Sequence, residues 1–172
     1  RPGTVCQRHP RASGLPPVNV YWRTAKGKQD TLSRIVAGPL DYQPCTKEVY
    51  SDLGIILMAE IVERLTGRTL DDLAKSYIFD PLKMSNTMFR PPKKLWPQIA
   101  PTEIDNNLRH RLVQGEVHDE NAFAIGGVSG HAGLFSTAPD PAAFFQRFLT
   151  GASSPHERIL PRPPHTPSTR PP

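Results

Sequence analysis

Three short segments of the sequence carry residue types that could perform hydrolytic chemistry. The first is Tyr50-Ser51-Asp52, directly before the clearest amphipathic pattern in the chain. A tyrosine at the start of a helix could relay a proton, because helix-terminal amides and nearby cations favour its phenolate. The alternative is structural: Tyr50 packs as a hydrophobic staple, and Ser51 or Asp52 caps the helix. Spacing alone favours this structural alternative.

The second segment, residues 127–131, comes close to a nucleophile elbow. It reads Gly-Val-Ser-Gly-His, so His131 stands where the G-x-S-x-G pattern requires its final glycine. No convincing buried strand precedes it, although the motif requires one. The sequence therefore does not favour Ser129 as a nucleophile.

The third segment offers metal donors within a short span. His118, Asp119, Glu120 and His131 match neither H-E-x-x-H nor a Cys/His zinc pattern. Loop side chains that bond to backbone and water are the favoured interpretation, and we predict neither a metal nor another cofactor. A metal-assisted hydrolase built on His118, Asp119 and His131 is a remote alternative.

Helical periodicity is strongest over residues 52–66 and 70–79. Apolar residues recur there at three- to four-residue spacing, which predicts two consecutive amphipathic helices. We expect Asp52 to cap the first helix, Gly67 to end it in a left-handed conformation, and Thr69–Asp72 to form a capping box for the second. The predicted apolar face of the first helix consists of Ile55, Met58, Ile61, Val62 and Leu65.

Weaker patterns predict the remaining elements. A third helix is expected over residues 139–150, a short helix over 31–37 and a short strand over 134–136. Residues 91–130 are rich in Pro, Asn, Gly and charge and are expected to form a long connection. Loops of this length usually border a functional site.

Composition argues against several classes of partner. The chain has 172 residues, a formal charge of +5 and 20 prolines. The cations form no Lys/Arg-rich run and do not alternate with aromatic residues, so no nucleic-acid partner is predicted. No segment reaches the roughly 18 apolar residues of a membrane span. Cys6 and Cys45 form no C-x-x-C pair and are expected to be free thiols.

Five segments, taken together and in order, carry a resemblance to a known family. Residues 13–16, 50–67, 78–84, 115–122 and 130–138 read SGLP, YSDLGIILMAEIVERLTG, IFDPLKM, GEVHDENA and GHAGLFSTA. They resemble the serine β-lactamase-related hydrolases, which include class C β-lactamases, D-Ala-D-Ala carboxypeptidases and many esterases. The resemblance extends from residue 13 to about residue 150.

The resemblance implies an α+β fold of the β-lactamase/transpeptidase type. This chain would hold mainly the helical region, with long loops and little of the antiparallel sheet. Residues 1–12 are then an irregular arm, 13–151 a partial domain and 152–172 a disordered tail rich in Pro and Arg. Helices without their sheet leave apolar surface exposed, so we expect marginal stability or aggregation.

The resemblance also implies an active site made of three motifs. They are S-x-x-K with the nucleophile, a tyrosine motif for proton transfer, and a late K-T-G or H-x-G strand beside the oxyanion site. Tyr50 matches the catalytic tyrosine, and Asp52 matches a substrate-binding Asn. Aspartate at this position adds negative charge, which favours neutral ester or amide substrates over β-lactams with their carboxylate. A candidate active-site loop contains His118, Asp119, Asn121 and His131.

Two of the three motifs are missing from this sequence. No serine is followed three residues later by lysine, and no late motif is recognisable. We therefore expect S-x-x-K upstream of this chain and no hydrolysis by the chain alone. The expected function is hydrolysis of a small ester or amide through an acyl-enzyme, and the alternative is a non-catalytic binding or scaffold relative. The sequence does not indicate the oligomeric state or the compartment: family members are often periplasmic or secreted, but this chain contains no signal peptide.

Overall fold

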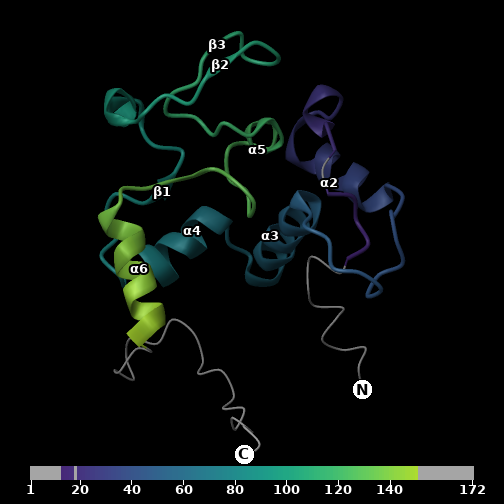
Figure 1. Cartoon of the computed structure of the whole chain (residues 1–172), viewed down its shortest axis with the longest axis horizontal. Helices are drawn as coiled ribbons and strands as arrows, with labels where there is room; N and C mark the ends of the chain where they lie inside the picture. The colour runs from purple at the N-terminus through teal and green to yellow at the C-terminus, as the bar shows by residue number, and fades with distance from the viewer. Residues whose placement is uncertain (1–12, 18, 151–172) are drawn as a thin grey trace, which may run out of the picture.

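The computed structural model describes residues 13–17 and 19–150, apart from the side chains of residues 148–150. Within this part of the chain, helices dominate and the strands form two short antiparallel pairs (Figure 1). The helical elements are η2 (Tyr21–Arg23), α2 (Gly27–Ala37), α3 (Asp52–Thr66), α4 (Leu70–Ala74), η3 (Lys75–Phe79), η4 (Lys93–Gln98), α5 (Glu120–Ala124) and α6 (Pro139–Thr150). Strand β1 (Met88–Phe89) pairs with β4 (Leu134–Phe135), and β2 (Ile104–Asp105) pairs with β3 (Arg111–Leu112). The predicted helix-rich α+β arrangement with little sheet is confirmed.

Helix α3 begins at the predicted residue, and of the two candidate caps Ser51, not Asp52, is the one that caps it. Ser51 is the N-cap, and its Oγ accepts a hydrogen bond from the Gly54 amide at 3.1 Å. Asp52 is the first residue inside the helix, where its negative charge favours the helix N-terminus. Gly67 ends the helix with φ of 66°, which confirms the predicted left-handed glycine.

The buried face of α3 differs from the predicted face. Leu53, Gly54 and Ile56 are buried, whereas Ile61 and Leu65 are 49% and 82% exposed. The helix carries apolar residues on more than one side. Periodicity therefore could not decide which side packs, because that depends on the neighbouring segments.

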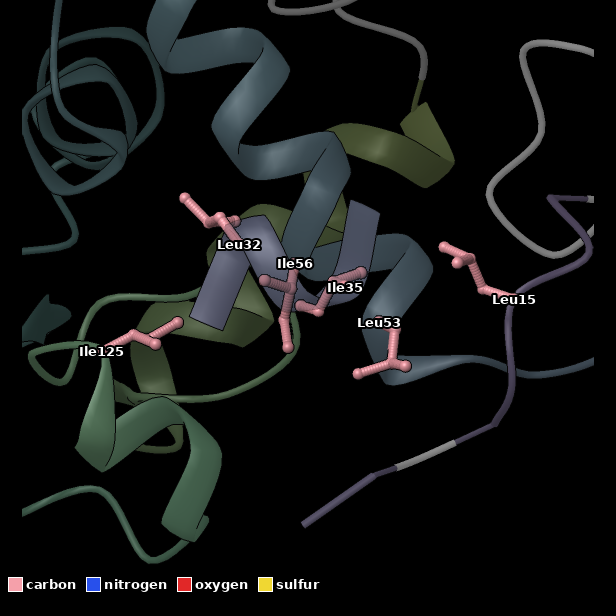
Figure 2. Close-up of a cluster of buried hydrophobic side chains, with 6 residues drawn as sticks. All are labelled: Leu15, Leu32, Ile35, Leu53, Ile56 and Ile125. Atoms are coloured by element: carbon pink, nitrogen blue, oxygen red, sulfur yellow. The ribbon is translucent and has the colours of Figure 1, made fainter. Parts of the chain in front are cut away.

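Helix α2 supplies much of the packing partner for α3. It is longer than the predicted helix over residues 31–37, and it buries Thr31 as well as two apolar residues. Figure 2 shows the resulting core, to which the segment before α2, both helices and the residue after α5 contribute. The core side chains are Leu15, Leu32, Ile35, Leu53, Ile56 and Ile125.

The predicted helix over 70–79 is present as α4 followed by the π-helical turn η3. Thr69 stands at the N-cap but makes no side-chain capping bond, so the predicted capping box is wrong. Glu63 takes this role: its Oε1 accepts a hydrogen bond from the Leu70 amide at 2.7 Å. Glu63 also pairs with Lys28 of α2, which ties the α3–α4 junction to the core.

The long connection contains η4, the β2–β3 hairpin and α5. The hairpin projects away from helices α3 and α4 (Figure 1). The Asp105 carboxylate closes its turn by accepting bonds from the amides of Leu108, Asn107 and Arg109 and from the Arg109 guanidinium. These bonds, with that from Leu108 the strongest, lower the pKa of Asp105 to about 2 against the opposing effect of desolvation.

The predicted helix over 139–150 and the predicted strand near 134–136 are confirmed as α6 and β4. In contrast, Cys45 is disulfide-bonded, so the expectation of a free thiol is wrong for this residue. Cys6 and the segments 1–12 and 152–172 lie outside the described residues. None of the helices in the described part of the chain is long and apolar enough to cross a membrane.

Several large apolar side chains lie at the surface of the part of the chain that the structure describes. Val36, Leu65 and Phe145 are 72%, 82% and 61% exposed. A groove of about 520 Å³ runs between α2 and α3, and its lining includes none of the candidate site residues. Marginal stability stays a prediction.

Candidate active site

The Tyr50-Ser51-Asp52 segment lies at the N-terminus of α3. Tyr50 is 64% exposed, which disagrees with its packing as a hydrophobic staple. Asp52 is half-buried in the first helical turn. Ser51, which lies between these two residues, is only 3% exposed.

Ser51 joins two of the segments that carry the family resemblance. Its Oγ donates a hydrogen bond to the Pro16 carbonyl at 2.7 Å, in addition to capping α3. The Asp52 amide donates to the Pro17 carbonyl at 2.8 Å. The SGLP turn is therefore bonded directly to the start of α3, and these bonds hold the two residues that follow Tyr50.

The candidate loop before α5 is fixed by the hairpin. The Arg109 side chain is 3% exposed, and its guanidinium donates to the carbonyls of Val117 and His118 at 2.8 and 3.2 Å. It also lies 4.2 Å from the ring centroid of Phe123 in α5. Asp105 neutralises its charge in this buried position at 2.9 Å.

Two of the four residues proposed for this loop organise α5. Asp119 is the N-cap, and its Oδ1 accepts a hydrogen bond from the Ala122 amide at 2.7 Å. Asn121 is 5% exposed; its Nδ2 donates to the Asn19 carbonyl at 2.8 Å and its Oδ1 accepts from the Trp22 amide at 3.1 Å. Asn121 therefore bonds α5 to the chain segment before α2.

The other two loop residues lie in different environments. His131 contacts Asp119 through Nε2 at 2.9 Å and Ser129 through Nδ1 at 2.7 Å. His118 is exposed instead and contacts Thr102 and Glu103 on the hairpin side. The structure thus brings Asp119 and His131 together but separates His118 from the pair.

The electrostatics of Asp119 favour its ionised form. Desolvation raises the pKa of this carboxyl. The bonds from His131 and from the Ala122 amide lower the pKa by more than desolvation raises it, so the net pKa lies below its usual value. Among the described residues, no group of three His, Cys, Asp or Glu side chains is arranged to hold a metal ion. Of the donors considered for a metal, His118, Asp119 and His131 take part in hydrogen bonds instead.

Sequence reasoning missed two features of this site. The double role of Ser51 follows from a contact with residue 16, which no local pattern reveals. The hydrogen bonds from Ser129 through His131 to Asp119 do not follow from the G-x-S-x-G pattern or from a metal-ligand pattern. A search for Ser, His and Asp within one loop could have found them.

Comparisons with known proteins place this geometry in a family. A family model described as Beta-lactamase matches residues 11–171. A protein of Escherichia coli (strain K12) that bears the name D-alanyl-D-alanine carboxypeptidase is 41% identical over 140 residues, which are 74% of this chain and 32% of the relative. The N-acetylmuramyl-L-alanine amidase of Bacillus subtilis (strain 168) is 40% identical over 161 residues, or 82% of this chain and 36% of the relative.

A solved structure supports the same fold. The β-lactamase/D-alanine carboxypeptidase of Yersinia pestis matches with a TM-score of 0.58 at 23% identity, over 80% of this chain and 37% of that one. The chain therefore spans about a third of the length of the relatives that it matches. Because the family model covers most of its residues, the chain belongs to the Beta-lactamase family.

Proposed function

We propose that this chain is part of a serine hydrolase that cleaves small ester or amide substrates through an acyl-enzyme. The observation that carries the proposal is the exposed Tyr50 at the firmly capped start of α3, beside the SGLP turn. The names of the two curated relatives, a carboxypeptidase and an amidase, both describe hydrolysis of an amide bond.

Tyr50 would transfer the proton in this reaction. The serine oxygen attacks the acyl carbon, its proton passes through the phenol oxygen of Tyr50 to the leaving amine or alcohol, and the bond to the leaving group breaks. Water then releases the acyl group by the reverse proton path. The serine and its lysine would come from an S-x-x-K motif outside this chain, because the present sequence contains none.

Asp52 would face the substrate two residues after the tyrosine. A carboxylate at that position repels a substrate carboxylate, so the proposal favours neutral substrates over β-lactams. The helix N-terminus offsets part of this negative charge, because its amides carry partial positive charge. The loop with His118, Asp119, Asn121 and His131 would border the cleft without providing the nucleophile.

The competing function is a non-catalytic binding or scaffold relative of the same fold. A fluorophosphonate probe separates the two on the full-length protein. The enzyme is labelled on the serine of S-x-x-K, whereas the scaffold is not labelled on any serine.

Tyr50→Phe then tests the proton transfer, with Tyr77→Phe as the matched control. Both tyrosines are 64% exposed, but Tyr77 lies in η3, away from the start of α3. We expect Tyr50→Phe to lower kcat by about 100-fold, which is typical for loss of a general acid–base group, and Tyr77→Phe to leave kcat unchanged. Equal kcat values for the two variants would contradict the role of Tyr50.

A further inference from the structure

Three polar side chains of this chain form a continuous hydrogen-bonded series. Ser129 Oγ lies 2.7 Å from His131 Nδ1, and His131 Nε2 lies 2.9 Å from Asp119 Oδ1. Asp119 favours the ionised state, and a carboxylate can only accept hydrogen bonds, so the tautomer with a single ring proton that fits both contacts carries this proton on Nε2. The lone pair of Nδ1 then points at the Ser129 hydroxyl, which must be the donor.

This arrangement contains a nucleophile, a base and a group that orients the base. Such a series of serine, histidine and carboxylate is one of the arrangements that activate a hydroxyl. The two imidazole nitrogens are used in the opposite order from the serine-protease template in which this logic was established. The order does not change the chemistry, because either ring nitrogen accepts a proton while the other donates to the carboxylate.

Burial separates the series from bulk water. Ser129 is 4% exposed and the His131 side chain is 4% exposed, whereas Asp119 retains 33% exposure at the N-cap of α5. Hydrogen bonds in such a low-dielectric setting are electrostatically stronger than in water. The same burial restricts access to Ser129, which favours small electrophiles over large ones.

The loop over Ser129 is built from glycines and lies against α3. A side chain at Gly130 would meet the Ile55 carbonyl at 2.8 Å, and one at Gly133 would meet the Gly127 carbonyl at 2.6 Å. Gly127 and Gly133 both have positive φ, which other residues rarely adopt. Gly130 lies between Ser129 and His131, so its close packing on α3 restricts the positions of both residues.

We propose that Ser129 is a second nucleophile of this protein, activated by His131 and oriented through Asp119, that accepts the acyl group of small neutral esters. The Ser129 oxygen forms a bond to the acyl carbon while its proton moves to His131 Nδ1. The ester C–O bond breaks, and the alkoxide leaving group takes that proton. This reaction is independent of Tyr50 and of the S-x-x-K serine of the proposed function.

The test uses the chain of 172 residues, which contains no S-x-x-K serine, and a small dialkyl fluorophosphate as the probe. The serine oxygen displaces fluoride from phosphorus, and the adduct is located by peptide mapping in a mass spectrometer. We expect the adduct on Ser129, and we expect Ser129→Ala to abolish it. Ser33→Ala removes an exposed hydroxyl on α2 and should leave the labelling rate unchanged.

Asp119→Asn is the decisive variant because asparagine is also a good N-cap and keeps α5 in place. Its amide can donate as well as accept, so it no longer fixes the imidazole proton on Nε2. We expect the labelling rate of Ser129 to fall by about 100-fold, the lower range for loss of general-base assistance, with an unchanged circular dichroism spectrum.

Two results would overturn the proposal. One is the absence of any adduct on Ser129 while the fold is intact. The other is an equal labelling rate in Asp119→Asn and in the unsubstituted chain, which would assign these hydrogen bonds to loop structure alone. Neither result bears on the S-x-x-K hydrolase, because that nucleophile is not in the tested chain.

Discussion

Replacing Ser51 with alanine tests whether one hydroxyl holds the start of α3. This residue is 3% exposed, and its Oγ accepts a bond from the Gly54 amide and donates one to the Pro16 carbonyl. Loss of an N-cap costs about 1 kcal/mol. Loss of the donor to the Pro16 carbonyl costs about 1 kcal/mol more, because that oxygen is left without its partner. We therefore expect the free energy of unfolding to fall by about 2 kcal/mol.

Urea unfolding followed by circular dichroism measures this change, and Ser33→Ala is the control. Ser33 is exposed, and its hydroxyl donates only to the Gln29 carbonyl of its own helix. A surface substitution of this kind changes stability by less than about 0.5 kcal/mol. If both variants lose the same amount, the bridge between the SGLP turn and α3 does not stabilise the protein. A change in the urea dependence would instead indicate altered compactness.

Three further substitutions address the core, the glycine loop and the hairpin. Leu53→Ala removes a side chain with 0% exposure and should lower the unfolding free energy by about 3 kcal/mol in the same urea assay. Gly130→Ala places a methyl group 2.8 Å from the Ile55 carbonyl, so thermal unfolding should show a loss of about 1–3 kcal/mol from overpacking. Asp105 has a folded pKa of about 2, below its value of about 3.9 in the unfolded chain. Its stabilising contribution is therefore complete well above pH 4 and is lost as the pH falls toward 2; unfolding measured across this range should show less acid sensitivity in Asp105→Asn.

Local patterns predicted the helices well because their signals are contained within a few residues. Gly67 ends α3 in a left-handed conformation, and α6 begins at residue 139, as predicted from the sequence. Neither feature needs information from elsewhere in the chain. The predicted bounds of these two helices, residues 52–66 and 139–150, match the structure.

Caps and buried faces were predicted less well because distant residues decide them. Glu63 takes over the capping of α4 from Thr69 only because the α3–α4 turn brings its carboxylate to the Leu70 amide. Ile61 lies on the predicted apolar face of α3, yet it is 49% exposed. The position of α2 selects the burying face, and no periodicity within α3 contains that information.

In the candidate site, too, local features could be predicted and long-range contacts could not. Tyr50 and Asp52 could be placed at a helix start from local sequence, and the structure locates them there. His131 could not be paired with Asp119 in the same way, because they lie twelve positions apart with several glycines between them, and the turn geometry decides whether they meet. A glycine-rich segment is compatible with many paths, so its sequence excludes few contacts. Gly130 approaches α3 closely, and it directly follows Ser129, so the same contact places this loop against the helix that begins two residues after Tyr50. The two candidate nucleophilic systems therefore share one structural support, and a substitution in α3 should be tested for its effect on both.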